Sequence, residues 1–219
     1  MALTKVIGDG VGVLTTADEG SLKIQTGTTS ASFLSFADGD NNRGYVKYDH
    51  NDDSLELGVA GESHFKIDSA HILTMDKQPA FLVQMSQDLT NFSTGTDHTI
   101  VFNSEVYDTN ADYNTSNYTF TAPVTGKYNV SCSIYIQNLD TAATYYQLKM
   151  VSSLGTYTTI LDPNFSADNL YYSWSTSPIL LALDANDTVK MQIRQTGGTA
   201  QTDINDNALY THFHGYLIC

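Results

Sequence analysis

The sequence is poor in positive charge and contains no long apolar run. Ten lysine and arginine residues stand against 24 aspartate and glutamate residues, giving a formal net charge of −14 at pH 7. A surface of that sign repels phosphate backbones and anionic membrane faces. No segment approaches the ~18 consecutive apolar residues of a membrane-spanning helix. We therefore expect neither a nucleic-acid partner nor membrane insertion.

Secretion signals and cysteines are equally scarce. The first nine residues, Met1 to Asp9, lack the charged leader and apolar run of a signal peptide, so we expect synthesis in a cytosol. The two cysteines, Cys132 and Cys219, fall on the apolar positions of their segments, and a reducing cytosol disfavours disulfides. Two buried free thiols are the prediction, although pairing between them stays open.

Catalytic motifs are missing as well. The sequence has no Gly-x-Ser-x-Gly elbow, His-Glu-x-x-His helix, phosphate-binding glycine loop or Cys-x-x-Cys pair. A glycoside hydrolase needs two positioned carboxyl groups. Nearly all carboxylates here stand in turn contexts such as Asp38-Gly39-Asp40 and Asp184-Ala185-Asn186-Asp187. We predict that the protein is not an enzyme.

A period of two dominates the second part of the chain. Apolar residues alternate with polar ones at Tyr128, Val130, Cys132, Ile134 and Ile136. This pattern predicts a strand with one buried face. Residues 179–183, a polar turn at 184–187 and residues 189–194 predict two more strands. Such runs recur about every ten residues from Phe81 to Ile218, the spacing of a sandwich or jelly roll, and helical periodicity is nowhere sustained.

Several short motifs occur in the order found in one known family. They are Pro79-Ala80-Phe81, Val101-Phe102-Asn103, Tyr113, Phe120-x-Ala122-Pro123-Val124-x-Gly126-x-Tyr128, Leu183-x-x-x-Asp187-x-Val189 and Phe213-x-Gly215-Tyr216-Leu217. Residues 78–219 thus resemble the globular head of the complement 1q and tumour necrosis factor superfamily. The resemblance implies a ten-stranded jelly roll that forms a homotrimer, with its last strand near the threefold axis. The collagen Gly-X-Y stem of animal members is missing.

The first part of the chain has a different resemblance. Phe36 to His50, Ser54 to Leu57 and His64 to Asp68 are similar to a segment of bacteriophage tail and side fibre proteins that precedes the distal domain. Its strands are short and separated by Asp, Asn and Gly turns, so one chain cannot bury a core with them. Three chains side by side can, which predicts a trimeric β neck that is unstable as a monomer.

Together these observations predict an all-β protein with two parts. Residues 1–77 would form a virion-attachment segment and a short trimeric β neck, and residues 78–219 a complement 1q/tumour necrosis factor-like jelly-roll knob. The predicted function is that of a phage fibre or spike protein, located in the virion, whose N-terminal segment contacts other virion proteins. The knob would bind a host surface glycan or outer-membrane protein. A capsid decoration or head-fibre protein and a cell-encoded complement 1q-like lectin are the alternatives.

Two motifs are candidate metal sites. His212 and His214 lie on the predicted last strand with both imidazoles opposite Phe213 and Gly215. Because the resemblance places this strand near the axis, three chains could offer six nitrogens to one axial transition-metal ion. Histidines packed at the subunit interface are the alternative. The segment Asp203-Ile204-Asn205-Asp206-Asn207 carries alternating oxygen ligands that resemble half a calcium loop, but it lacks the central glycine and distal glutamate of an EF-hand, so a plain polar loop is the favoured interpretation.

Aromatic residues supply the candidate receptor surface. Residues 78–219 contain twelve of the fourteen tyrosines and the only tryptophan. Rigid amphipathic rings among small polar groups favour binding of sugars or proteins. We predict a receptor surface formed by Tyr157, Tyr171, Tyr172 and Trp174, with packing inside the domain or the trimer as the competing role.

Overall fold

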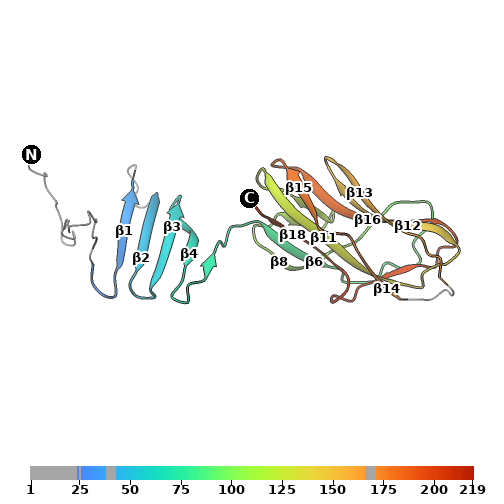
Figure 1. The fold of residues 1–219 in the computed structure, drawn as a ribbon, viewed down its shortest axis with the longest axis horizontal. Helices are drawn as coiled ribbons and strands as arrows, with labels where there is room; N and C mark the ends of the chain where they lie inside the picture. Colours follow the sequence, from blue (N-terminus) through green and yellow to red (C-terminus); the bar gives the residue numbers. More distant parts are fainter. Residues whose placement is uncertain (1–23, 25, 38–42, 166–170) are drawn as a thin grey trace, which may run out of the picture. The chain divides into compact units, whose positions relative to one another are not determined.

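The computed structural model describes residue 24 and residues 26–37, 43–165 and 171–219 (Figure 1). All regular elements among these residues are β-strands, which confirms the all-β fold class. The chain divides into two compact units, residues 1–77 and residues 78–219. Most of the predicted virion-attachment segment and part of the fibre-like motif, residues 38–42, lie outside the described residues. No described helix is long and apolar enough to cross a bilayer.

The first unit is an antiparallel sheet whose strands follow one another in chain order. They are β1 (Ala31–Phe36), β2 (Gly44–Asp49), β3 (Ser54–Val59), β4 (Glu62–Ile67) and β5 (Leu73–Thr74). The β3–β4 turn uses left-handed backbone at Ala60 and Gly61, with φ angles of 53° and 86°. This conformation allows the tight reversal that joins two strands.

The two faces of this sheet differ in chemistry. Because directly opposed residues share a face, the register assigns each side chain to one side. One side, which we call the β1–β5 apolar face, carries Leu34, Val46, Tyr48, Leu55, Leu57, Val59, Phe65, Ile67 and Leu73. The opposite side carries Lys47, Glu56 and Lys66 in one row across β2, β3 and β4.

Burial in this sheet is the reverse of the usual distribution. On β3 the polar residues Ser54 and Glu56 are buried, whereas Leu55, Leu57 and Val59 are exposed. Glu56 Oε1 lies 3.0 Å from Lys47 Nζ and 3.6 Å from Lys66 Nζ. Contacts among its own charged side chains therefore bury the polar side of the sheet, while the β1–β5 apolar face is exposed to solvent.

The second unit consists of two antiparallel sheets packed on one core. The first, which we call the β11 sheet, has the order β14-β11-β18-β6-β8, with β15 and β17 also paired to β11. Its strands are β6 (Ala80–Gln84), β8 (Ser104–Asp108), β11 (Gly126–Gln137), β14 (Tyr172–Ser175), β15 (Ile179–Leu183), β17 (Asp203–Asn205) and β18 (His212–Leu217). The long strand β11 holds the sheet together because four other strands pair with it.

The second sheet, the β16 sheet, has the order β13-β12-β16-β10-β9, with β7 also paired to β16. Its strands are β7 (His98–Thr99), β9 (Tyr113–Asn114), β10 (Thr119–Thr121), β12 (Ala143–Ser152), β13 (Gly155–Leu161) and β16 (Thr188–Gly197). Since the strands of both sheets alternate between buried and accessible residues, their inner faces meet in one apolar core.

Aromatic rings fill one end of that core. Phe81 stacks on Phe120 with ring centroids 4.6 Å apart and meets Phe213 edge-on at 5.0 Å. Gly215 makes room for this cluster, because a Cβ atom there would lie 2.9 Å from the Phe81 ring and 3.2 Å from the Asn129 carbonyl oxygen. The glycine of the terminal motif is thus required by packing.

The predicted strands of the second unit are confirmed, with one error at its end. The predicted inward positions of β11 all lie in the apolar core of the second unit: Tyr128, Val130, Cys132, Ile134 and Ile136. The prediction of two buried thiols is wrong for Cys219, which is exposed, whereas Cys132 is buried; both are free. Strand β18 ends at Leu217, so the alternation that fixes Phe213 and Gly215 no longer applies at Cys219.

Candidate functional site

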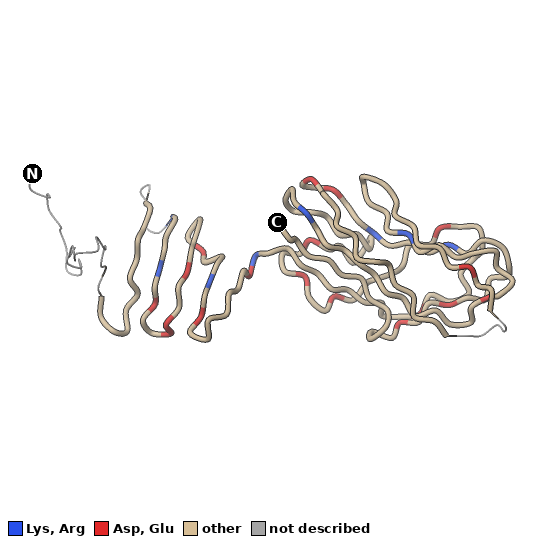
Figure 2. The backbone as a smooth tube through the Cα atoms, in the orientation of Figure 1, with Lys and Arg blue, Asp and Glu red and all other residues tan. Residues whose placement is uncertain are grey.

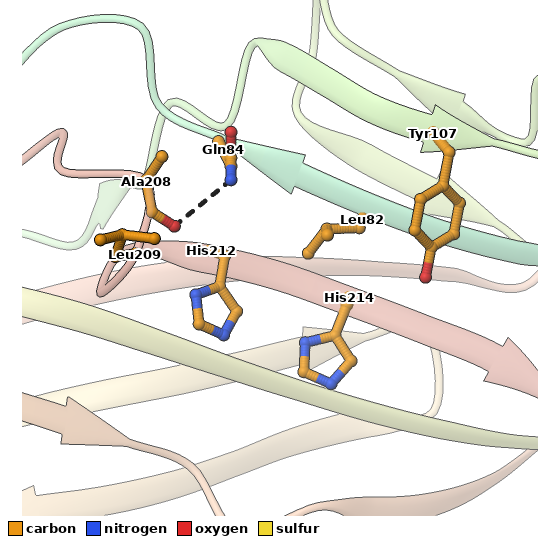
Figure 3. A pocket seen from close by; sticks show the side chains of 7 residues that line it. All are labelled: Leu82, Gln84, Tyr107, Ala208, Leu209, His212 and His214. Atoms are coloured by element: carbon orange, nitrogen blue, oxygen red, sulfur yellow. Dashed lines mark hydrogen bonds between the residues drawn. The ribbon is translucent and has the colours of Figure 1, made fainter.

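His212 and His214 lie on the outer face of the β11 sheet, opposite the buried side chain of Phe213 (Figure 3). Their ring centroids are 5.6 Å apart and the rings are 28° from parallel. A hydrogen bond of 2.9 Å joins His214 Nε2 to Ser131 Oγ on the neighbouring strand β11. The Nδ1 atom of His214 is buried without a hydrogen-bond partner among the described residues.

Burial sets the protonation of this pair. It lowers the pKa of His212 below the ordinary histidine value, since a charged imidazole loses its hydration there. It also lowers the pKa of His214, and the charge of His212 lowers it further. Both rings therefore favour the neutral form at neutral pH, which is the form that binds metal ions.

A shallow hollow of about 400 Å³ lies beside the two rings. Leu82 and Gln84 of β6, Tyr107 of β8, and Ala208 and Leu209 before β18 complete its lining (Figure 3). Gln84 Nε2 donates a hydrogen bond of 3.3 Å to the Ala208 carbonyl oxygen, which fixes one side of the hollow. The site thus combines apolar walls with two neutral imidazoles.

One chain does not supply a complete metal site. No group of three or more His, Cys, Asp or Glu side chains placed to hold an ion occurs within the described part of the chain. His212 and His214 offer two nitrogens, so any ion here needs ligands from further copies.

Three residues of the predicted calcium segment, Asp203, Asn205 and Asn207, use side-chain oxygens as hydrogen-bond acceptors within the chain. Asp203 accepts hydrogen bonds from the Asn91 backbone at 2.7 Å and from Asn138 Nδ2 at 2.6 Å. The side-chain oxygens of Asn205 and Asn207 accept from backbone amides two residues further on. These oxygens shape the loop.

The four predicted receptor residues do not form one surface. Tyr171 is 62% exposed, whereas Tyr172 and Trp174 on β14 are partly buried against the core. Tyr172 stacks on Phe165 with ring centroids 4.4 Å apart. Tyr157 lies on β13 of the other sheet, opposite Met150. The structure separates Tyr157 from the other three and turns Tyr171 away from Tyr172 and Trp174.

Tyr171 instead belongs to a tyrosine cluster that the sequence reasoning missed. The ring centroid of Tyr135 on β11 lies 6.0 Å from that of Tyr171 and 5.0 Å from that of Tyr210. The outward position of Tyr135 can be predicted from the alternation of β11, because this residue stands between the inward residues Ile134 and Ile136. Tyr210 comes from a distant loop, and no local pattern indicates its position.

Comparison with known families decides the identity of the second unit, since the model of the C1q domain matches residues 80–218. The chain belongs to the C1q domain family. Solved structures similar to it include the globular domain of zebrafish complement 1qA, with 19% identity, 65% of this chain and 98% of that chain covered, and a TM-score of 0.47. Murine APRIL at pH 8.5 is another, with 10% identity, 65% and 100% covered, and a TM-score of 0.45. No curated protein matches the chain.

The family assigns the C1q domain of this chain to a class of function. C1q domains are binding or structural modules, in agreement with the missing catalytic motifs. The matched residues begin at Ala80 on β6, so the β1–β5 sheet lies outside the family match.

Proposed function

We propose that this protein is a homotrimeric phage fibre or spike protein, located in the virion and made in the host cytoplasm, whose C1q domain binds the host cell surface. The observation that carries the proposal is the β1–β5 apolar face. A continuous apolar face on a single sheet marks an interaction site, because soluble monomers rarely expose one. The C1q match supports a binding module at the other end of the same chain.

A trimer gives the first sheet the core that it lacks. If three copies turn their β1–β5 apolar faces toward a common axis, Leu55 and Leu57 leave water in every chain. Leu55 and Leu57 are 37% and 43% exposed in one chain, so burying the rest of each contributes roughly 1 kcal/mol. The row of Lys47, Glu56 and Lys66 then faces solvent, where its ion pairs already satisfy the charges. This arrangement corresponds to the neck of a fibre.

The outer face of the β11 sheet suits contact between the heads. Tyr107, Leu209 and Tyr210 are exposed there, next to the half-buried His212 and His214. In such a contact, three copies of the histidine pair could surround one axial metal ion. Tyr171 lies on this side of the sheet too, so the trimer contact would cover it. Of the predicted receptor residues, Tyr157 on β13 is the exposed one that this contact would leave accessible.

Adsorption to cells tests this function. Labelled full-length protein should bind host bacteria, and a variant that no longer trimerises should lose most of the binding because avidity depends on linked heads. Particles released by lysis should carry the protein. If the protein is instead absent from purified particles and present only with the cells, the cell-encoded lectin, which the C1q match supports equally, replaces the fibre.

A further inference from the structure

Most positive charge of the C1q domain is gathered on one face. The domain contains four basic residues, Lys127, Lys149, Lys190 and Arg194. Three of them lie on β12 and β16, and Figure 2 shows their blue positions following one another along these strands. Their direct neighbours Leu148, Met191 and Ile193 are buried in the core, so the basic side chains share the outer face of the β16 sheet. The fourth, Lys127, belongs to the other sheet.

The register arranges this outer face in rows. Lys149 is directly opposite Gln192, Gln147 is opposite Arg194, and Val151 is opposite Lys190. Lys190 and Arg194 are four residues apart on one strand, about 13 Å. Lys149 lies on the next strand, opposite the midpoint between them, about 8 Å from each by the strand spacing. Gln192 Nε2 also reaches Thr99 Oγ1 at 3.5 Å, which places an amide and a hydroxyl among the cations.

One carboxylate enters this group. Asp97 Oδ1 lies 2.6 Å from Lys149 Nζ and 3.6 Å from Arg194 Nη1. The hydrogen bond from Lys149 contributes most to the lowered pKa of Asp97, so the carboxylate stays ionised. The Arg194 side chain keeps 32% of its surface exposed, whereas Lys149 keeps only 13%. Asp97 thus occupies the position that a ligand carboxylate would take, and the face retains a net positive charge.

We propose that the outer face of the β16 sheet binds an acidic polysaccharide, a glycan with carboxylate groups spaced along its chain. Lys190 and Arg194 would pair with carboxylates about 13 Å apart along the chain, and Gln147, Gln192 and Thr99 would bond sugar hydroxyls. A glycan with widely spaced carboxylates is favoured over a nucleic acid as the ligand. The chain as a whole carries a net charge of −14, which repels the dense phosphate charge of a nucleic acid. The inference rests on the proposed function, since it names the ligand class of the host-binding head.

Binding of full-length protein to polygalacturonate at low salt tests this inference, with dextran as the neutral control polymer. We expect binding to polygalacturonate alone, weakening as salt rises. Lys190→Gln with Arg194→Gln should reduce the affinity at least about tenfold, the loss expected for charged hydrogen bonds. Asp97→Asn should increase it, because the competing carboxylate is gone. Lys127→Gln is the matched control and should leave it unchanged.

Three results overturn the inference: no binding of the native protein to polygalacturonate, an equal loss in Lys127→Gln, or tighter binding of double-stranded DNA. Adsorption to cells separates this inference from the proposed function. If the Lys190/Arg194 double variant stays trimeric and still adsorbs fully, the fibre function stands and the glycan site does not. If the native protein fails to adsorb at all, the proposed function itself is wrong.

Discussion

Glu56 and Leu57 are adjacent on β3, yet the glutamate is 6% exposed and the leucine 43% exposed. Their side chains point to opposite sides of the β1–β5 sheet. Lys47 and Lys66 flank the glutamate, whereas within the described part of residues 1–77 the leucine side stays partly exposed. The sheet therefore exposes an apolar side suited to a partner, and our proposal is that further copies of the same chain cover it.

The first prediction concerns that partner face. Leu55→Asp combined with Leu57→Asp should weaken the trimer, so that it dissociates at a higher protein concentration than the native trimer, because two charges would enter its apolar centre and lose hydration. Size-exclusion chromatography with light scattering measures the change in mass. Thr74→Asp introduces the same charge on the opposite side, beside Lys66, and should leave the trimer intact. A double variant that dissociates at the same protein concentration as the native protein would show that another copy does not cover this face.

The second prediction concerns the ion pairs of Glu56. Burial alone would raise the pKa of this carboxyl, but hydrogen bonds from Lys47 and Ser63 outweigh burial and hold it below the ordinary value. Glu56→Gln should lower the free energy of unfolding by about 2 kcal/mol at about pH 7.

The sign of the pH dependence follows from the lowered pKa. Glu56 stabilises the sheet above the ordinary glutamate pKa of about 4.3, and the stabilisation is lost as the pH falls through the lower pKa of the folded state. Urea unfolding of the native protein and of Glu56→Gln should therefore give a difference in the free energy of unfolding that becomes smaller at acidic pH. An unchanged difference at about pH 3 would mean that the charge of Glu56 is not responsible.

The third prediction concerns His212 and His214. Protein purified without nickel affinity should contain a transition metal at less than one ion per chain, as three chains share it, and His214→Ala should lose the ion. Because burial lowers the pKa of both imidazoles, binding should persist somewhat below about pH 6.5. Ser131→Ala removes only the hydroxyl bonded to His214 and should retain the metal. Native protein free of bound metal would leave the pair as packed histidines.

The fourth prediction separates the aromatic residues. Trp174→Ala should destabilise the domain by about 2 kcal/mol, less than the ~3–5 kcal/mol of a fully buried tryptophan, because its ring is only partly buried. Tyr171→Ala and Tyr157→Ala should change stability by less than about 0.5 kcal/mol, as both rings are exposed. Adsorption assays then report binding alone for Tyr157→Ala, whereas Tyr171→Ala also alters the face of the proposed contact between heads. Equal thermal stability of Trp174→Ala and native protein would contradict its packing against the core.

Sequence patterns predict the jelly roll well because its strands obey local rules. The alternation of β11 identifies Tyr128, Val130 and Ile134 as core residues, and all three are buried. The same rule fails at Cys219, which is exposed: β18 ends at Leu217, although Lys127 N still donates a hydrogen bond of 2.8 Å to the Cys219 carbonyl oxygen. Local periodicity therefore predicts burial within the regular strand, but not in the residues that follow its end.

The candidate sites were less predictable, because they depend on which strands become neighbours. Tyr157 and Tyr171 are close in the sequence, but Tyr157 lies on β13 of the β16 sheet, whereas Tyr171 directly precedes β14 of the β11 sheet. The ion pair between Asp97 and Lys149 joins residues 52 positions apart, and nothing in either segment indicates the other. The side of a strand on which a residue lies can be predicted from alternation, whereas its neighbours across the sheet cannot.

Native mass spectrometry of the full-length protein, purified without nickel affinity, tests trimer formation most directly. We predict a species of three times the 24.0 kDa chain mass, with an added metal mass that disappears in His214→Ala. A single-chain mass at all protein concentrations would contradict the trimer, and with it both the closed neck and the axial metal site.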